Sequence, residues 1–313
     1  MKSYQPTITN TPYWAATITF IGSVFFSTKA VLVKLAYQYG VDSASLLALR
    51  MAFAMPFYIF FAFREKRKSK AIGLQLSRKD WTQMILLGIT GFYVASMLDF
   101  LGLQYISAGF ERLILFTYPT IVVLIIWIFF GEKINKTQLT ALILTYLGIG
   151  LAFAENMQTS NQKNFILGAS LVFACAIAYA SYLVGSGRLL PRIGTIRYTS
   201  ISMIAAALTI FLHNGIANGF EWFGFAWQVY LFAFLMATLA TVIPSFMIGE
   251  GIRIIGSSNA SIIGSIGPIS TIILAYIFLD ERLGILQCIG TLLVISGVLF
   301  ISLNKQKKRT LKE

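Results

Sequence analysis

Ten apolar segments, each roughly long enough to cross a membrane, follow one another along this 313-residue chain. A helix that crosses the hydrocarbon core of a bilayer needs about 20 mostly apolar residues. The segments are expected at residues 14–36, 43–63, 81–101, 107–130, 137–154, 165–185, 196–213, 225–248, 257–279 and 284–303. The longest connection, expected at 64–80, is mostly charged and too short for a folded soluble domain. The sequence therefore predicts an all-α integral membrane protein with ten transmembrane helices.

Composition excludes the main alternatives to a membrane protein. Hydrophobic residues make up 57% of the chain and charged residues only 12%, whereas a soluble domain is typically about 25% charged. High hydrophobicity also argues against intrinsic disorder. The two cysteines, Cys175 and Cys288, lie in apolar runs, so no disulfide framework is expected. The first segment carries Lys29 and Lys34, which is not typical of a cleavable signal peptide.

The basic residues predict how the chain is oriented. With a cytoplasmic N-terminus, nineteen of the 25 Lys and Arg residues fall in cytoplasmic loops or termini, and only Lys163 and Arg282 fall outside. Such a bias follows the positive-inside rule. We therefore expect a multi-pass protein of the plasma membrane (the bacterial inner membrane) with both termini in the cytoplasm. The basic tail at 304–313 is expected to contact anionic lipid rather than nucleic acid.

The second half of the chain repeats the first at an offset of 149 residues. The equivalent pairs include Ile106 and Ile255, Pro119 and Pro268, Glu132 and Glu281, Gln138 and Gln287, and Gly148 and Gly297. Because each half holds an odd number of spans, the second half enters the membrane from the opposite face. The sequence thus predicts two inverted-topology five-helix repeats, at 1–154 and 155–303. Many secondary transporters are built in this way.

Short motifs in both halves resemble a known family. The first half contains Tyr-Ile-Ser-Ala-Gly at 105–109, Tyr-Pro-Thr at 118–120 and Gly-Glu-Lys-Ile at 131–134. The second half contains Ser-Ser-Asn-Ala at 257–260, Pro268 and Asp-Glu-Arg-Leu at 280–283. Over nearly its full length the chain resembles the EamA-type transporters of the drug/metabolite transporter (DMT) superfamily. The resemblance implies a carrier of amino acids, nucleobases, sugars, cofactors or drugs, and it alone suggests export.

Charged residues within the spans are the candidate functional residues. A charge at the centre of a span costs about 2.5–3.5 kcal/mol on insertion scales, so it usually faces the bundle interior and is paired. The charged set is Lys29, Lys34, Arg50, Asp99, Glu111, Arg112 and Glu250. The candidate substrate-binding residues are Lys29, Arg50, Asp99, Glu111, Arg112 and Tyr118.

Each of these charges has a structural alternative. Neighbouring residues on a helix point about 100° apart, so Glu111 and Arg112 either recognise a zwitterion or have separate structural roles. In the structural alternative Arg112 pairs with Asp99, and Glu111 stabilises a helix N-terminus. Lys29 is expected to contact either the substrate or a carboxylate. An arginine at the position of Arg50 more often holds helices together than binds a ligand. Asp99 or Glu250 could carry a coupling proton.

Proline and tyrosine residues within the spans are further candidates. Pro119 and Pro268 are expected to kink their helices at equivalent places. The kinks would suit paired gates, with static curvature as the alternative. Tyr93, Tyr118, Tyr146, Tyr179 and Tyr182 include candidates to line a cavity.

The absent motifs narrow the expected function. The chain has one histidine, His213, and no phosphate-binding glycine loop, so no enzyme activity, metal site, cofactor or ATP motor is expected. We expect a secondary active transporter, an exporter of small polar or zwitterionic metabolites such as amino acids, that works by alternating access. Its partners would be a small-molecule substrate, membrane lipids and a coupling proton, with the protein as monomer or homodimer. The alternatives are a lipid-handling, flippase-like component and a non-transporting membrane subunit.

Overall fold

Helices make up nearly all of the chain in the computed structural model, which describes residues 12–72, 76–131, 136–159, 164–219, 222–264, 266–282 and 284–296. No strand occurs within these ranges. The elements, with η marking a π-helix, are α1 (Pro12–Tyr37), α2 (Ser43–Ile72), α3 (Arg78–Gly88), η2 (Ile89–Val94), α4 (Ala95–Gly102), α5 (Ala108–Leu115), α6 (Tyr118–Phe130), α7 (Lys136–Thr159), α8 (Phe165–Ile193), α9 (Thr195–Asn218), α10 (Trp227–Ala237), η3 (Thr238–Val242), α11 (Ile243–Ile263) and α12 (Ile266–Leu279). A further apolar helix runs from Ile285 to Ser296.

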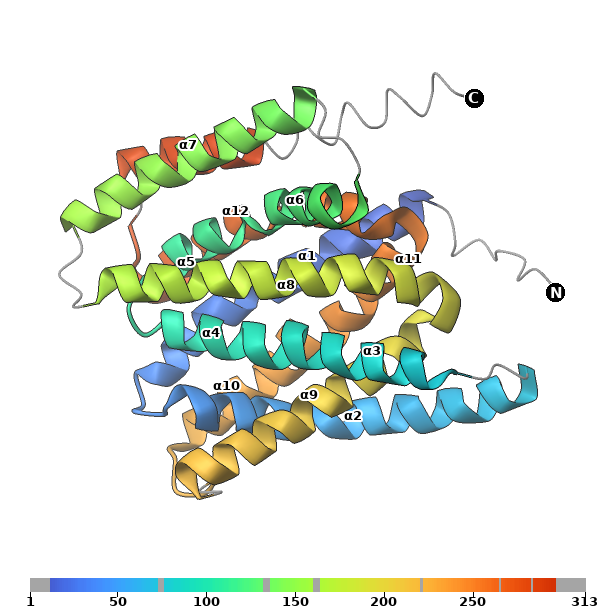
Figure 1. Ribbon diagram of the computed structural model, residues 1–313. Coiled ribbons are helices and arrows are strands. Elements are labelled where there is room, and N and C mark those ends of the chain that lie inside the picture. The colour runs from blue at the N-terminus through green and yellow to red at the C-terminus, as the bar shows by residue number, and fades with distance from the viewer. Residues whose placement is uncertain are drawn as a thin grey trace.

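The predicted ten-helix membrane fold is confirmed. Seven helical stretches are long and apolar enough to cross a membrane: Pro12–Tyr37, Ser43–Glu65, Arg78–Gly102, Ala108–Phe130, Phe165–Ile193, Thr195–Asn218 and Trp227–Ser257. Three shorter apolar helices, Tyr146–Glu155, Ile266–Leu279 and Ile285–Ser296, complete the set. The helices lie side by side with their axes roughly aligned (Figure 1). Large apolar side chains such as Phe63, Phe129 and Ile285 point outward, as suits contact with lipid tails.

The two ends of the bundle differ in charge. We call the end where α1 begins and α2 ends face A, on the right in Figure 1, and the opposite end face B. Basic residues of the described chain that lie toward face A are Arg64, Arg78, Lys79, Lys136, Arg188, Arg192, Arg197 and Arg253. Toward face B the described chain has Lys34 and Arg282. Whereas α1 begins at face A, α8 begins at face B, so the second half runs through the bundle in the opposite sense.

Both halves contain a π-helix at the same place in the repeat. The segment η2 begins at Ile89, and η3 begins 149 residues later at Thr238. Short π-helical segments are rare, and they often occur at functional sites. Their recurrence at the offset found in the sequence supports the internal repeat.

Each half also contains one span that is built from two short helices. In the first half, α5 ends at Leu115 and α6 begins at Tyr118. In the second, Gly256 interrupts α11 with a left-handed φ of 81°, and α12 begins at Ile266 after a short helical piece. The broken fourth span of each half therefore matches at the 149-residue offset.

The expected proline kinks take a different form. Pro119 and Pro268 lie in the first turns of α6 and α12, so each proline begins the second piece of a broken span. Proline is tolerated at a helix start because the backbone N–H groups of the first turn have no intrahelical acceptor. Each proline thus lies at the break in its span, and its expected role in a gate stays a prediction.

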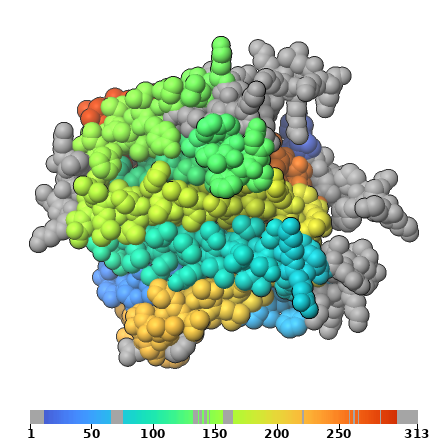
Figure 2. All heavy atoms as spheres, viewed as in Figure 1, coloured from blue at the N-terminus to red at the C-terminus, as the bar shows by residue number. Residues whose placement is uncertain are grey.

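The two halves pack against each other through α1 and α11, α2 and α9, and α4 and α8. Figure 2 shows α8 lying against α3 and α4, which in turn border α9. Small residues permit close approach: a Cβ on Gly102 would come within 3.1 Å of the Gly168 carbonyl oxygen. A Cβ on Gly251 would overlap the side chain of Thr19. These two contacts are equivalent in the repeat, so the same close crossing between the halves occurs twice.

The first prediction concerns helix packing. A Cβ on Gly148 would overlap the carbonyl oxygen of Gly290, whereas nothing lies within 4 Å of one on Gly150. Gly148→Ala should therefore lower the free energy of unfolding by about 1–3 kcal/mol, the usual cost of overpacking. Gly150→Ala, on the same helix, should raise it by about 0.5–1 kcal/mol because alanine favours helix. Thermal unfolding in detergent measures both, and equal melting temperatures would contradict this packing.

Several predicted boundaries are wrong because helices continue beyond the apolar core. Helix α2 extends to Ile72, into the charged segment expected to be a loop. Helix α8 extends to Ile193, and α11 continues through the polar residues after Ile248. Outside the hydrocarbon layer, water and headgroups solvate polar side chains, so helical hydrogen bonding can persist there. Glu132 and the tail at 304–313 lie outside the described residues.

Candidate functional site

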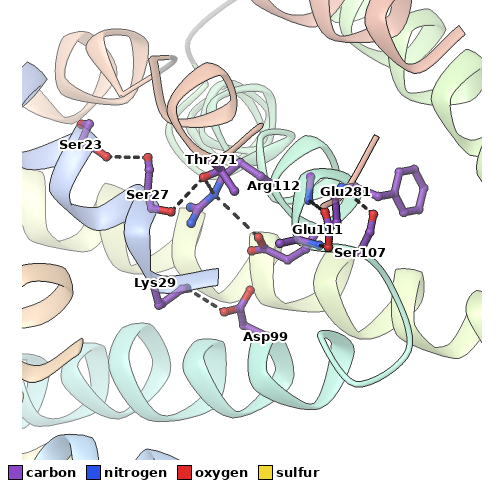
Figure 3. Close-up of polar contacts among 12 residues, drawn as sticks. Ser23, Ser27, Lys29, Asp99, Ser107, Glu111, Arg112, Thr271 and Glu281 are labelled. Carbon is purple, nitrogen blue, oxygen red and sulfur yellow. Dashed lines mark hydrogen bonds and ion pairs between the residues drawn. The ribbon is translucent and has the colours of Figure 1, made fainter. Parts of the chain in front are cut away.

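Five charged side chains inside the bundle are almost completely buried. The exposed fraction is 3% for Lys29, 3% for Arg50, 4% for Arg112, and 0% for both Asp99 and Glu111. They come from α1, α2, α5 and α4, and Figure 3 shows four of them converging between these helices. Since an intramembrane charge is costly and usually functional, this cluster is the candidate site.

Lys29 and Asp99 form a buried ion pair between α1 and α4. Lys29 Nζ lies 2.7 Å from Asp99 Oδ2, and it also lies 4.8 Å from the centre of the Phe26 ring. Of the two alternatives for Lys29, the structure therefore shows the carboxylate partner. The pair joins two helices far apart in the sequence, and neither charge is left uncompensated.

Arg112 connects the two halves of the protein. Its Nε donates a hydrogen bond of 3.0 Å to Thr271 Oγ1 on α12, and Thr271 Oγ1 in turn donates one of 3.0 Å to the Ser27 carbonyl oxygen on α1. Figure 3 shows this chain of contacts. The alternative in which Arg112 pairs with Asp99 is wrong, because Lys29 takes that position. Arg112 thus ties α5 to the second repeat.

Glu111 is buried without a hydrogen bond to either carboxylate oxygen in the described structure. Its Oε2 lies 3.7 Å from Arg112 Nε, which is an electrostatic contact beyond hydrogen-bond length. Capping of α5 falls to other residues: Ser107 Oγ accepts from the Phe110 N–H, and Glu281 accepts from the next N–H groups upstream. Glu111 is therefore not the residue that caps this helix.

Glu281 makes a second link between the repeats. Its Oε1 accepts the Ala108 N–H at 2.9 Å and its Oε2 accepts the Gly109 N–H at 3.0 Å. A carboxylate at a helix N-terminus satisfies free donors and complements the helix dipole. In the sequence, Glu281 stands out through its match with Glu132 and as part of the Asp-Glu-Arg-Leu motif, and neither signal predicts a contact with α5.

Arg50 has a different environment from the other cations. One guanidinium nitrogen of Arg50 donates to Ser96 Oγ at 3.1 Å, which links α2 to α4. Arg50 Cζ lies over the Phe100 ring, 5.1 Å from its centre. Its Nε has no hydrogen-bond partner in the described structure. The helix-locking role expected from sequence is present, but it uses only part of the guanidinium.

Two adjoining pockets lie in the middle of the bundle. They share the lining residues Phe26, Leu115, Tyr179 and Ile248, so we treat them as one central cavity. The larger pocket is lined by four pairs of residues that are 149 positions apart: Phe26 and Cys175, Gly91 and Ala240, Phe92 and Thr241, and Ser96 and Ser245. The cavity therefore lies between equivalent surfaces of the two repeats, including both π-helices.

The other candidates fall inside and outside this cavity. Tyr118, Tyr179 and Tyr182 line it, whereas Tyr146 is 42% exposed on the outer surface. Glu250 accepts hydrogen bonds from Arg253 and Thr195 toward face A, away from the buried cluster. Within the described ranges, no group of three His, Cys, Asp or Glu side chains is placed to hold a metal ion.

Comparison with known proteins agrees with this architecture. The model described as the EamA-like transporter family matches residues 13–154 and 166–303. The uncharacterized transporter YcbK of Bacillus subtilis is 33% identical over 304 residues, which cover 92% of this chain and 93% of that protein. The uncharacterized inner membrane transporter YicL of Salmonella typhimurium is 24% identical, covering 92% and 95%.

A solved crystal structure shares the fold. It superimposes with a TM-score of 0.64 at 18% sequence identity, covering 94% of this chain and 98% of the other. At that identity the likeness concerns the fold alone. The family match extends over both halves and includes the helices that enclose the cavity. The chain belongs to the EamA-like transporter family and is a multi-pass membrane transporter.

Proposed function

We propose that the protein is a secondary active transporter that exports small polar or zwitterionic metabolites, such as amino acids, by alternating access. The observation that carries this proposal is the central cavity, which is bordered by equivalent residues of two inverted repeats. Repeats related in this way can exchange conformations around a fixed site near the midplane. Buried charges beside the cavity supply the polar recognition that such substrates need.

Flux into proteoliposomes tests the proposed function. Purified protein would be reconstituted and supplied with a radiolabelled panel of amino acids and small carboxylates. We expect saturable uptake of at least one compound, above that of liposomes without protein. If none of the panel moves and none raises the melting temperature of the protein, the proposed substrate class is wrong.

A coupling proton would be held within the buried cluster. Asp99 is closely paired with Lys29 at 2.7 Å, whereas the Glu111 carboxylate lies 3.7 Å from Arg112 Nε, beyond hydrogen-bond length. Carboxylates inside membrane spans commonly serve as proton carriers. Glu111 is therefore our candidate for the group that takes up and releases the proton during transport.

The charge difference between the two faces supports a cytoplasmic face A in the plasma membrane. Lys79 and Arg282 lie near opposite ends of the bundle and are exposed. Of the native cysteines, Cys175 is buried and Cys288 is exposed, so Cys288→Ser provides a suitable background. In intact cells an impermeant maleimide should label Arg282→Cys, and it should reach Lys79→Cys only after permeabilisation. The reverse pattern would contradict the proposed orientation.

The lipid-handling alternative would need a route from the bilayer to the cavity. An apolar groove between α2, α3 and α9 is lined by Ile59, Phe63, Trp81 and Arg197, among others. None of its lining residues also lines the central cavity. The groove therefore gives no access to the buried charges, and we favour a substrate that enters along the bundle axis.

A further inference from the structure

The charged residues that line the central cavity all carry the same sign. Lys29, Arg50 and Arg112 are among its lining residues. The two acidic residues of the cluster, Asp99 and Glu111, are not, and both have an exposed fraction of 0%. A compound inside the cavity would therefore contact cationic side chains, whereas the compensating carboxylates do not line the cavity.

Only one of the three cations lacks an acidic partner. Lys29 is paired with Asp99, and Arg112 lies beside Glu111. No described carboxylate lies within ion-pair distance of Arg50, whose guanidinium donates to a serine hydroxyl and lies over an aromatic ring. An unpaired charge in a membrane interior is unfavourable, and a bound anion would neutralise it.

The geometry of arginine suits a carboxylate. A guanidinium presents donors in a planar fork that can engage both oxygens of a carboxylate. Ser96 Oγ occupies one nitrogen of Arg50 at 3.1 Å, and Nε has no partner in the described structure. At least one guanidinium donor is therefore left unsatisfied in a residue that lines the cavity.

Besides the three cations and the hydroxyl groups of serine and threonine residues, much of the cavity wall is aromatic or apolar. Phe92 and Tyr182 pack edge to face with ring centres 4.7 Å apart, and Tyr179 stacks on Tyr182 at 6.0 Å. Phe26 stacks on Tyr179 from the other side at 6.2 Å. Such a surface favours an apolar or aromatic group over a second charged group.

From these observations we propose that Arg50 binds the carboxylate of the transported compound, and that the substrate is an organic carboxylate with an apolar body lying against the aromatic wall. This assignment rests on the proposed transport function and specifies the substrate class of the same cavity. An amino group on the substrate is permitted but is not what the site recognises. Arg50 is thus the residue that discriminates a carboxylate from its neutral amide.

Binding to purified protein tests this assignment. The probes are 3-phenylpropionate, its neutral amide 3-phenylpropionamide and the zwitterion L-phenylalanine, each titrated by calorimetry. We expect the wild type to bind the acid about 10–100-fold more tightly than the amide, as fits charge-assisted hydrogen bonds. Arg50→Gln should lose this preference while its affinity for the amide stays unchanged. Arg50→Lys, which keeps the charge without the fork, should retain part of the preference.

The control is Lys34→Gln, which removes a cation from α1 that does not line the cavity. It should bind the acid like the wild type. Full acid preference in Arg50→Gln, or tighter binding of the amide than the acid by the wild type, would overturn the assignment. If Arg50→Gln does not fold, Arg50→Lys decides the question: an unchanged affinity for the acid overturns the assignment. Transport of panel compounds in proteoliposomes would still stand in each case, so the two proposals can fail separately.

Discussion

Replacing Asp99 by asparagine is expected to abolish transport and to lower the free energy of unfolding by about 3–5 kcal/mol, the usual cost of removing one partner of a buried ion pair. Lys29 Nζ lies 2.7 Å from the Asp99 carboxylate, and both side chains are buried. With asparagine at position 99, the ammonium group would lose its compensating charge. Thermal unfolding in detergent measures the stability, and flux into proteoliposomes measures the transport.

A double variant separates stability from function. Lys29→Met combined with Asp99→Leu removes both charges and leaves an apolar contact of similar volume. Stability should return to near that of the wild type, since buried ion pairs contribute little relative to packed apolar side chains. Transport should remain absent. Normal transport by the double variant would show that the pair has only a structural role, and an unchanged melting temperature of Asp99→Asn would contradict its burial.

Replacing Glu111 by glutamine is expected to reduce transport driven by a pH gradient to the level of empty liposomes, and to lower the melting temperature less than Asp99→Asn does. The Glu111 carboxylate has no hydrogen bond in the described structure, and its 3.7 Å contact with Arg112 Nε is looser than the 2.7 Å pair of Lys29 and Asp99. The amide cannot take up and release a proton. Exchange of labelled for unlabelled substrate, which needs no net proton movement, should persist.

Glu250→Gln is the matched control for this prediction. Glu250 also lies within an apolar span, but it is paired with Arg253 and Thr195 toward face A. Its variant should keep transport driven by a pH gradient. If Glu250→Gln loses that transport while Glu111→Gln keeps it, the proton site lies toward face A rather than in the buried cluster.

The spans and the repeat could be predicted from sequence because both produce patterns that can be recognised in the sequence itself. Apolar runs of membrane-spanning length define the helices, and the 149-residue offset identifies the repeat. The buried charges could also be predicted, since a polar residue in such a run must face the bundle interior. All five, Lys29, Arg50, Asp99, Glu111 and Arg112, are buried as expected.

The partners of those charges could not be predicted. Whether Asp99 pairs with Lys29 or Arg112 depends on how α1, α4 and α5 cross. Tertiary packing sets these crossings, and local sequence patterns do not specify it. The same holds for Thr271, which receives the Arg112 hydrogen bond from 159 positions away. The role of Glu281 as a cap of α5 could not be predicted from its repeat position or its motif, because it depends on contact between the halves.

The two π-helices were missed for a related reason. An extra residue in a helical turn leaves no clear mark on a segment that is apolar on all sides. The helix break at Gly256 was likewise hidden, since glycine is common in transmembrane helices without ending them. The structure reveals that these irregular places recur in both halves and that the two π-helices line the cavity.

The halves contribute differently to the cavity despite their common architecture. All five buried charges of the cluster belong to the first half. The equivalent positions in the second half are Ala178, Thr199, Ile248, Ala260 and Ser261. The second half instead supplies Tyr179 and Tyr182 to the wall. The charged side chains of the cavity wall thus come from the first repeat alone, whereas aromatic side chains come from both repeats.

Counterflow tests the central claim of alternating access most directly. Proteoliposomes are loaded with an unlabelled compound that the flux panel has identified, and a trace of the same compound, radiolabelled, is added outside. A carrier that exposes one cavity to each side in turn predicts a transient accumulation of label above its equilibrium level, followed by a slow decline. Label that rises only to equilibrium, as through an open channel, would contradict alternating access.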